Sequence, residues 1–252
     1  MAKTFTTEHT IQYYEADVKQ HVTLPMLINI SLEASTQQAA SLHIGEEEVH
    51  SRGLGWIILE SSLDIHEMPR VHDTVTVKTW VEEANSFFSI RHFQVIKDDD
   101  VMVEIKMLFA LLDMVSRKLT RIPDDFIEVL EPKAVKRVKR LANNDMWAEG
   151  DDWDHVTEYA VRYNDIDTNL HVNNSHYYEW TTDALGVDFL ANHRPVSMVV
   201  RFEHEIGVRD TVVSRYQKDE LVTKHQICTG DTVGAQANIV WQKETDVPSF
   251  KM

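Results

Sequence analysis

The sequence predicts an α+β protein of two similar halves, each with one long helix against an antiparallel sheet. The first observation is an internal repeat, because identical residues recur 150 positions apart at Tyr13 and Tyr163, Asp17 and Asp167, and His21 and His171. The second is the order of patterns in each copy: a short strand, a polar loop, a helix and then several strands. The third is a polar, charged stretch between the copies, which is typical of a linker. We therefore expect an N-terminal unit over 1–132, a linker over 133–152 and a C-terminal unit over 153–252.

The first copy starts with the strand pattern "TIQYY" and passes through a polar loop into a helix pattern. Thr23 suits the N-cap of this helix and Pro25 its first turn, where the missing N–H of proline costs nothing. Apolar residues then recur at helical spacing, and Gly45 is expected to end the helix. Strand-like runs rich in β-branched and aromatic residues follow, and "KDDDV" between two of them predicts a hairpin turn.

The second copy repeats this plan from "YAVRY" to "GAQANIVWQKE", with Asn173 or Asn174 as the expected N-cap of its helix. A helix that a sheet surrounds on most sides must be apolar nearly all round, as the segment 26–40 is. We therefore expect each sheet to wrap its helix, and the two units to pack as a pseudo-dimer within one chain.

Composition excludes several classes of function. The net charge of −16 argues against nucleic acid as a partner, because a duplex repels an acidic surface. The single cysteine, Cys228, excludes an internal disulfide and a cysteine-built zinc site. No stretch is apolar over the length of a membrane span, and "MAKTFTTEHT" has no secretory signal. We expect a cytoplasmic protein that uses no metal or other cofactor and binds no membrane.

Small polar residues are concentrated just before the second helix, in "NDIDTNLHVNN". Asp167, Asn169 and His171 alternate, so in an extended loop they face one spot beside a helix N-terminus that favours negative charge. A carboxylate, an amide, an imidazole and a helix end suit acyl transfer, since they can hold a water and stabilise an oxyanion. The alternative is that they only cap the helix. The first copy has Lys19 at the place of Asn169, which indicates one live site and one retired site.

The segment "DIDTNLHVNNSHYYEW" resembles the D-x-N-x-H-V-N-N-x-x-Y-x-x-W signature of the fatty acyl-acyl carrier protein (ACP) thioesterases. "WIILESSLDIHEMPRVHDTVTVKTW" and "FEHEIGVRDTV" extend the resemblance over nearly the whole chain. It implies a tandem, or double, hotdog fold and hydrolysis of fatty acyl-ACP to free fatty acid and holo-ACP, which ends fatty acid synthesis. Part of the signature is shared with hotdog enzymes that cleave coenzyme A (CoA) thioesters. An acyl-CoA thioesterase and a non-catalytic acyl-binding module therefore remain as alternatives.

The resemblance carries the catalytic residues of the family over to Asp167, Asn169, His171 and Glu205. The first copy has Met68 at the place of the glutamate, which again indicates a retired site. The cysteine that follows the glutamate in the family is Ile206 here, and Cys228 lies in a strand pattern, so a thiol nucleophile is not expected. Two routes remain: the glutamate and histidine prepare a water, or the aspartate attacks the thioester directly.

The implied substrate is the acyl chain linked through phosphopantetheine to ACP, the expected partner. The residues expected to bind it are Asn173, Asn174, Met26, Leu27, Ile30 and Ala34, with the strand "WIILESS". Because ACP is acidic, docking on this acidic protein requires a local basic surface. The candidates are Lys133, Lys136, Arg137 and Arg140 in "KAVKRVKR", for which the alternative is the solvated face of a linker helix. The acyl chain length and a homodimer are left open.

Overall fold

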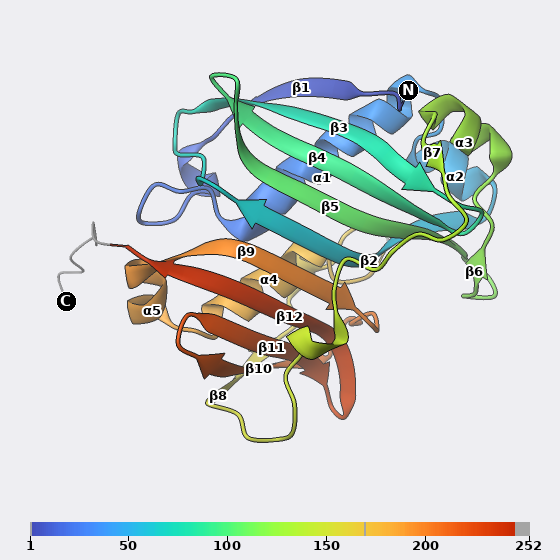
Figure 1. Ribbon diagram of the computed structural model, residues 1–252. Helices are drawn as coiled ribbons and strands as arrows, with labels where there is room; N and C mark the ends of the chain where they lie inside the picture. The colour runs from blue at the N-terminus through green and yellow to red at the C-terminus, as the bar shows by residue number, and fades with distance from the viewer. Residues whose placement is uncertain (1, 169, 245–252) are drawn as a thin grey trace.

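The computed structural model describes residues 2–168 and 170–244, and it shows two halves in which a curved sheet packs around a central helix (Figure 1). The first half contains β1 (Phe5–Thr10), η1 (Tyr13–Glu15), α1 (Leu24–Ser41), α2 (Glu46–Ser51), β2 (Leu54–Ile65), β3 (Thr74–Ala84), β4 (Phe88–Lys97), β5 (Asp100–Asp113), β6 (Leu119–Thr120) and α3 (Asp124–Leu130). Between the halves lie β7 (Lys133–Ala134) and η2 (Asn144–Met146). The second half contains β8 (His155–Ala160), η3 (Tyr163–Asp165), α4 (Asn174–Asp183), α5 (Val187–Asn192), β9 (His193–Phe202), β10 (Thr211–Asp219), β11 (Val222–Thr229) and β12 (Thr232–Lys243).

The described strands form one sheet whose order is the same on both sides of its centre. Hydrogen bonds join β1-β3-β4-β5-β2-β9-β12-β11-β10-β8, with β6 on β5 and β7 on β3. The first half thus places its strands outward from β2 as the second half does from β9, as expected for two copies of one unit. The central pair runs antiparallel, from Glu60 opposite Arg201 to Asp64 opposite Ser197. The predicted pseudo-dimer within one chain is confirmed.

The helix starts follow the predicted capping, whereas one predicted end is wrong. The Thr23 hydroxyl accepts a hydrogen bond from the Met26 amide at 3.4 Å, and the Asn173 side chain accepts one from the Ser175 amide at 2.9 Å. Gly45 does not end α1; it is the N-cap of α2, and α1 ends at Ser41. The predicted hairpin is present, because residues 98 and 99 connect β4 and β5 with φ values of 51° and 69°.

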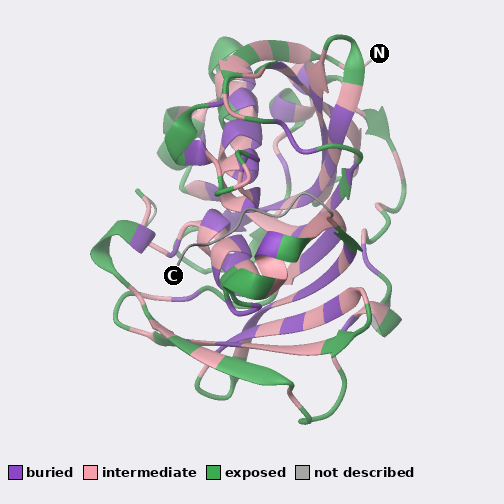
Figure 2. Ribbon diagram, turned by 90° about the vertical axis from the view of Figure 1, so that its left-hand side faces the viewer, coloured by how far each residue is buried: buried purple, intermediate pink, exposed green. Residues whose placement is uncertain are grey.

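The hydrophobic core is continuous between the two halves. Leu27 on α1 and Phe93 on β4 belong to the same buried cluster as Tyr178 on α4 and Trp241 on β12. Figure 2 shows buried residues, in purple, on both the central helices and the strands that curve around them. Within the described residues, no helix is both long and apolar enough to cross a membrane.

A buried carboxylate joins the linker to both halves. Glu60 on β2 is fully buried, and its Oε1 accepts hydrogen bonds from Arg140 Nη1 at 2.8 Å and from Arg201 Nε at 3.2 Å. Its Oε2 accepts one from the Leu141 amide at 2.8 Å. One acidic side chain from the first half therefore holds the linker and a strand of the second half together.

We expect Glu60→Ala to lower the free energy of unfolding by about 3 kcal/mol, because it leaves Arg201 without its buried counter-ion. Glu82→Ala is the matched control, since Glu82 pairs with Lys106 at the surface, and we expect it to cost about 1 kcal/mol or less. Urea unfolding followed by tryptophan fluorescence measures both. Equal losses in the two variants would contradict this role of Glu60.

Candidate active site

The loop before α4 has the same backbone hydrogen bonds as the loop before α1. The Asp167 amide donates to the His171 carbonyl at 2.9 Å, and the Asp17 amide donates to the His21 carbonyl at 2.8 Å. The residue before each histidine has a left-handed conformation, with φ of 66° and 65°. This tight turn returns the chain so that the aspartate and the histidine lie next to each other at the start of the helix.

The backbone also pairs this loop with the segment that carries Glu205. The Val172 amide donates to the Ile206 carbonyl at 3.3 Å, and the Val22 amide donates to the Pro69 carbonyl at 2.8 Å. Ile206 and Pro69 are therefore equivalent in the two halves. Consequently Met68 is the counterpart of Glu205, which is the alignment that the repeat predicts.

Glu205 contacts two basic side chains, one from each half of the chain. Its Oε2 lies 3.2 Å from His171 Nε2, and the same oxygen accepts a hydrogen bond from Arg117 Nη2. Arg117 belongs to the turn between β5 and β6 in the first half, so the two halves build this cluster together. No pattern in the sequence predicts this contact, because Arg117 lies in the other copy, 88 positions from Glu205. In the sequence, Arg117 is only one of three nearby basic residues, with Lys118 and Arg121.

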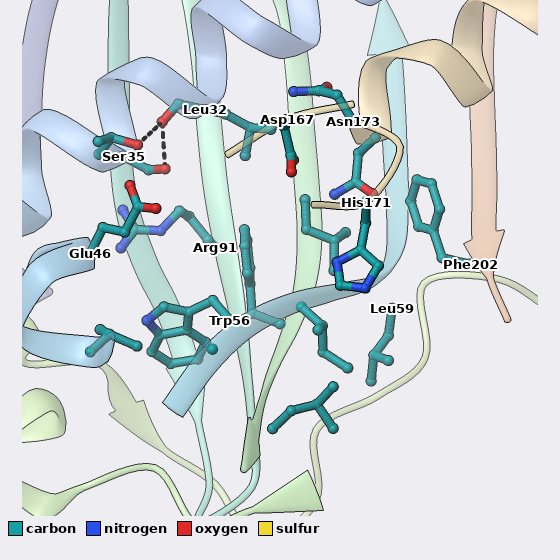
Figure 3. A pocket seen from close by; sticks show the side chains of 18 of the residues that line it. Leu32, Ser35, Glu46, Trp56, Leu59, Arg91, Asp167, His171, Asn173 and Phe202 are labelled. Atoms are coloured by element: carbon teal, nitrogen blue, oxygen red, sulfur yellow. Dashed lines mark hydrogen bonds between the residues drawn. The ribbon is translucent and has the colours of Figure 1, made fainter. Parts of the chain in front are cut away.

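Asp167 and His171 project into one pocket from the loop before α4 (Figure 3). Asn173 and Asn174, at the N-terminus of that helix, line the same pocket. Asn169 lies outside the described residues. The structure thus brings Asp167, His171 and Glu205 to one cavity wall, beside a helix N-terminus that can stabilise a developing negative charge.

The cavity has a volume of about 660 Å³ and extends from this wall into the first half. That is large enough for an extended small-molecule chain. Its apolar lining from β2 is Trp56, Ile57, Ile58 and Leu59, which lie in the strand predicted to contribute. The four α1 residues that are predicted to bind the acyl chain do not line this cavity. Met26, Leu27, Ile30 and Ala34 pack in the core, and the cavity is lined by Leu32, Ser35, Thr36 and Ala39 instead.

The equivalent place in the first half is a separate cavity of about 350 Å³, lined by Asp17, Lys19, His21 and Met68 among others. Lys19 Nζ donates to the carbonyls of Leu190 and His193 at 2.9 and 2.7 Å and to Glu244 Oε2 at 2.6 Å. All three of these acceptors belong to the second half. Burial, the main cause, lowers the pKa of His21, so its neutral form is favoured.

Neither Cys228 nor Ile206 offers a nucleophile to the large cavity. Ile206 is completely buried, and its amide donates to the Tyr177 hydroxyl at 3.1 Å. Cys228 is buried in β11 and is not among the residues that line the cavity. Burial raises the pKa of its thiol, which keeps the sulfur protonated and unreactive.

The basic segment between the halves is not a helix. Lys133 begins β7, and Lys136 and Arg137 follow it as exposed residues without regular structure. Arg140 differs from the other three, because its guanidinium pairs with buried Glu60. Among the described contacts, the side chains of Lys133, Lys136 and Arg137 form no ion pair of this kind.

The two-layer halves, the shared sheet and the cavity together define a double hotdog protein. Residues 2–130 match the sequence model of the acyl-ACP thioesterase N-terminal domain, and residues 149–243 match that of the C-terminal domain. The chain belongs to the acyl-ACP thioesterase family. The resemblance noted in the sequence and the tandem hotdog fold that it implies are both confirmed.

Relatives of known name agree with this assignment. The chain is 23% identical to a chloroplastic acyl-[acyl-carrier-protein] hydrolase of Cuphea viscosissima over 220 residues, covering 83% of this chain and 53% of that one. It is 25% identical to the dodecanoyl-[acyl-carrier-protein] hydrolase of Umbellularia californica, covering 83% and 58%. The chain therefore spans little more than half the length of these relatives.

Solved structures show the same fold. A Lactobacillus plantarum protein provisionally named an oleoyl thioesterase superposes with a TM-score of 0.91 at 30% identity, covering 98% of both chains. The 12:0-ACP thioesterase of Umbellularia californica superposes with a TM-score of 0.81 at 21% identity, covering 96% of this chain and 98% of that one. At that identity the second likeness shows the fold alone.

We expect the Cys228 thiol to react with an aromatic disulfide reagent many times more slowly in the native protein than in urea. The reason is that a buried, protonated thiol is both inaccessible and a poor nucleophile. The absorbance of the released thiolate measures the rate. Fast, complete reaction without denaturant would show that the sulfur is reachable and would reopen a role for it.

Proposed function

We propose that the protein hydrolyses the thioester of fatty acyl-ACP to free fatty acid and holo-ACP. The observation that carries the proposal is the His171–Glu205 pair, which lies with Asp167 on the wall of a cavity that apolar residues of β2 also line. An acyl chain fits such a cavity, and its thioester would lie beside the polar wall. A non-catalytic acyl-binding module would need the cavity but not a carboxylate held between an imidazole and a guanidinium.

The geometry supports a route through water. Glu205 Oε2 is occupied by His171 and Arg117, while Oε1 has no partner among the described residues. Oε1 is therefore the oxygen available to take a proton from a water that attacks the thioester carbonyl. The carbonyl oxygen becomes an oxyanion, which the N-terminus of α4 can stabilise, and the phosphopantetheine thiol leaves with a proton. Asn169 is proposed, from the family resemblance, to help hold the water.

The alternative route begins at Asp167, whose carboxylate would attack the carbonyl and expel the thiol to leave an acyl anhydride. Water would then cleave the anhydride. A single turnover in ¹⁸O-labelled water tests this route, because label found in the protein requires attack by Asp167 followed by cleavage at the aspartyl carbonyl. Label found only in the fatty acid of the first turnover would exclude that sequence of steps.

The decisive experiment measures free thiol after incubation with acyl-ACP and with the matching acyl-CoA. We expect release from acyl-ACP, with a higher kcat/KM than for acyl-CoA. No release from either substrate would contradict an enzyme and favour the binding module. Release from acyl-CoA alone would contradict the carrier protein as substrate.

If the chain has one live site, equivalent substitutions in the two halves have unequal effects. We expect Asp167→Asn, His171→Ala and Glu205→Gln each to lower kcat by a factor on the order of 10² or more, the scale for losing a general base or an oxyanion partner. The controls Asp17→Asn, His21→Ala and Cys228→Ser should leave kcat within a few fold. A loss at Asp17 as large as that at Asp167 would indicate two active sites.

The docking surface for ACP is proposed to be the exposed basic segment at Lys133, Lys136 and Arg137, which lies in the part of the chain between the halves. An acidic carrier approaching a chain of net charge −16 gains from a local positive patch that offsets the general repulsion. Arg140 is also predicted to dock the carrier, but its guanidinium pairs with Glu60, so it is left out of the test below.

We expect the double substitution Lys136→Glu and Arg137→Glu to raise KM for acyl-ACP severalfold and to weaken the salt dependence of kcat/KM. Hydrolysis of a small acyl thioester without a carrier should be unchanged. Lys218→Glu with Lys243→Glu is the control, since it reverses two exposed charges in the second half. If both double variants raise KM equally, net charge rather than this segment controls docking.

A further inference from the structure

The wall of the large cavity carries a buried arginine without an ionic partner. Arg91 on β4 lines the cavity, and only 9% of its surface is exposed. Its Nη1 donates to Gln38 Oε1 at 2.5 Å and to Thr79 Oγ1 at 3.2 Å, and both acceptors are neutral. Among the ion pairs of residues 2–168 and 170–244 there is none that includes Arg91. Glu46 also lines the cavity but does not pair with it.

Arg91 nevertheless keeps its charge. Burial lowers its pKa to about 10, which still leaves the guanidinium protonated at neutral pH. A buried charge is costly unless counter-charges, hydrogen bonds or water replace its hydration. Two neutral partners satisfy only one of its terminal nitrogens, so the rest of the guanidinium depends on water in the cavity. An apolar group that displaced this water would form no hydrogen bonds with the guanidinium to replace those of the water.

The sheet places Arg91 away from the polar site. Phe202 on β9 lies beside His171 in Figure 3, and β9, β2, β5 and β4 are consecutive neighbours in the sheet. Arg91 pairs with Met107, Met107 with Ser61, and Ser61 with Val200 on β9. Three strand spacings therefore separate β9 from β4, or about 14 Å. The cavity residues of the intervening strands are mostly apolar and include Trp56, Ile58, Phe109 and Leu112.

An acyl chain that starts at His171 thus follows an apolar wall and then meets a cation. We propose that Arg91 sets the upper limit of acyl chain length in this cavity, because the methyl end of a longer chain would strip water from the guanidinium. The inference rests on the proposed thioesterase function and adds to it a residue that determines specificity. The substrate that this inference assigns to the site is an acyl chain without polar substituents, whose methyl end stops before Arg91.

The test is a series of saturated acyl-ACP substrates that differ by two carbons, assayed with the wild type and with Arg91→Met. Methionine keeps an unbranched, flexible side chain, although a shorter one, and removes the charge. For the first chain beyond the wild-type limit, we expect kcat/KM relative to the preferred chain to rise about fifteenfold, since two buried methylenes contribute roughly fourfold each. Shorter chains should change within a few fold.

Three controls keep the result interpretable. Arg91→Lys retains a cation and should retain the limit, and Arg121→Met removes an exposed arginine and should not move it. Arg91→Gln keeps a hydrogen-bonding side chain and replaces Arg91→Met if that variant does not fold. An unchanged chain-length profile in a folded Arg91→Met or Arg91→Gln protein would overturn the inference. Absence of thiol release by the wild type from every acyl-ACP would instead contradict the proposed function.

Discussion

The pairing of β2 with β9 is the constraint on which the rest of the molecule depends. Five residue pairs, from Glu60–Arg201 to Asp64–Ser197, join two curved sheets into one and fix the position of each half relative to the other. Because of this register, the turn after β5 can place Arg117 against Glu205, and the cavity can run from a wall of the second half into the first. The cluster at Glu205 is therefore a product of the pairing, and neither half contains it alone.

Duplication explains why the polar site is asymmetric although the backbone is not. Both copies keep the tight aspartate-to-histidine turn, with equivalent hydrogen bonds and equivalent left-handed residues. In the second copy the turn faces a large cavity. In the first, Lys19 extends to the carbonyls of Leu190 and His193 and to Glu244, so the same turn ties the C-terminal part of the second half to the first. The same loop geometry therefore forms the polar wall of a cavity in the second half and a contact between the halves in the first.

The sequence was sufficient for the features that local physics determines. The repeat, the Thr23 and Asn173 caps and the hairpin at residues 98 and 99 follow from short-range rules, and the structure contains all of them. It was not sufficient where a feature depends on packing between distant segments. Helix α1 has apolar residues on more than one face, so hydrophobic spacing does not show which face meets the cavity and which meets the core. Arg117, Lys19 and Arg140 act on partners in other elements, and no spacing in the sequence connects them.

Charged side chains that are buried among the described residues have a partner of opposite charge, and Arg91 departs from this rule. Glu60 has two guanidinium partners and Lys19 has a carboxylate, as expected for ions held away from water. Arg91 has no such partner among the described residues, although burial lowers its pKa. A paired ion contributes mainly to holding segments together, since removing either member leaves the other uncompensated. An unpaired ion on a cavity wall acts on the contents of the cavity, because its hydration changes whenever the occupant changes. The same physical cost thus makes Glu60 a structural residue and Arg91 a residue that discriminates between occupants.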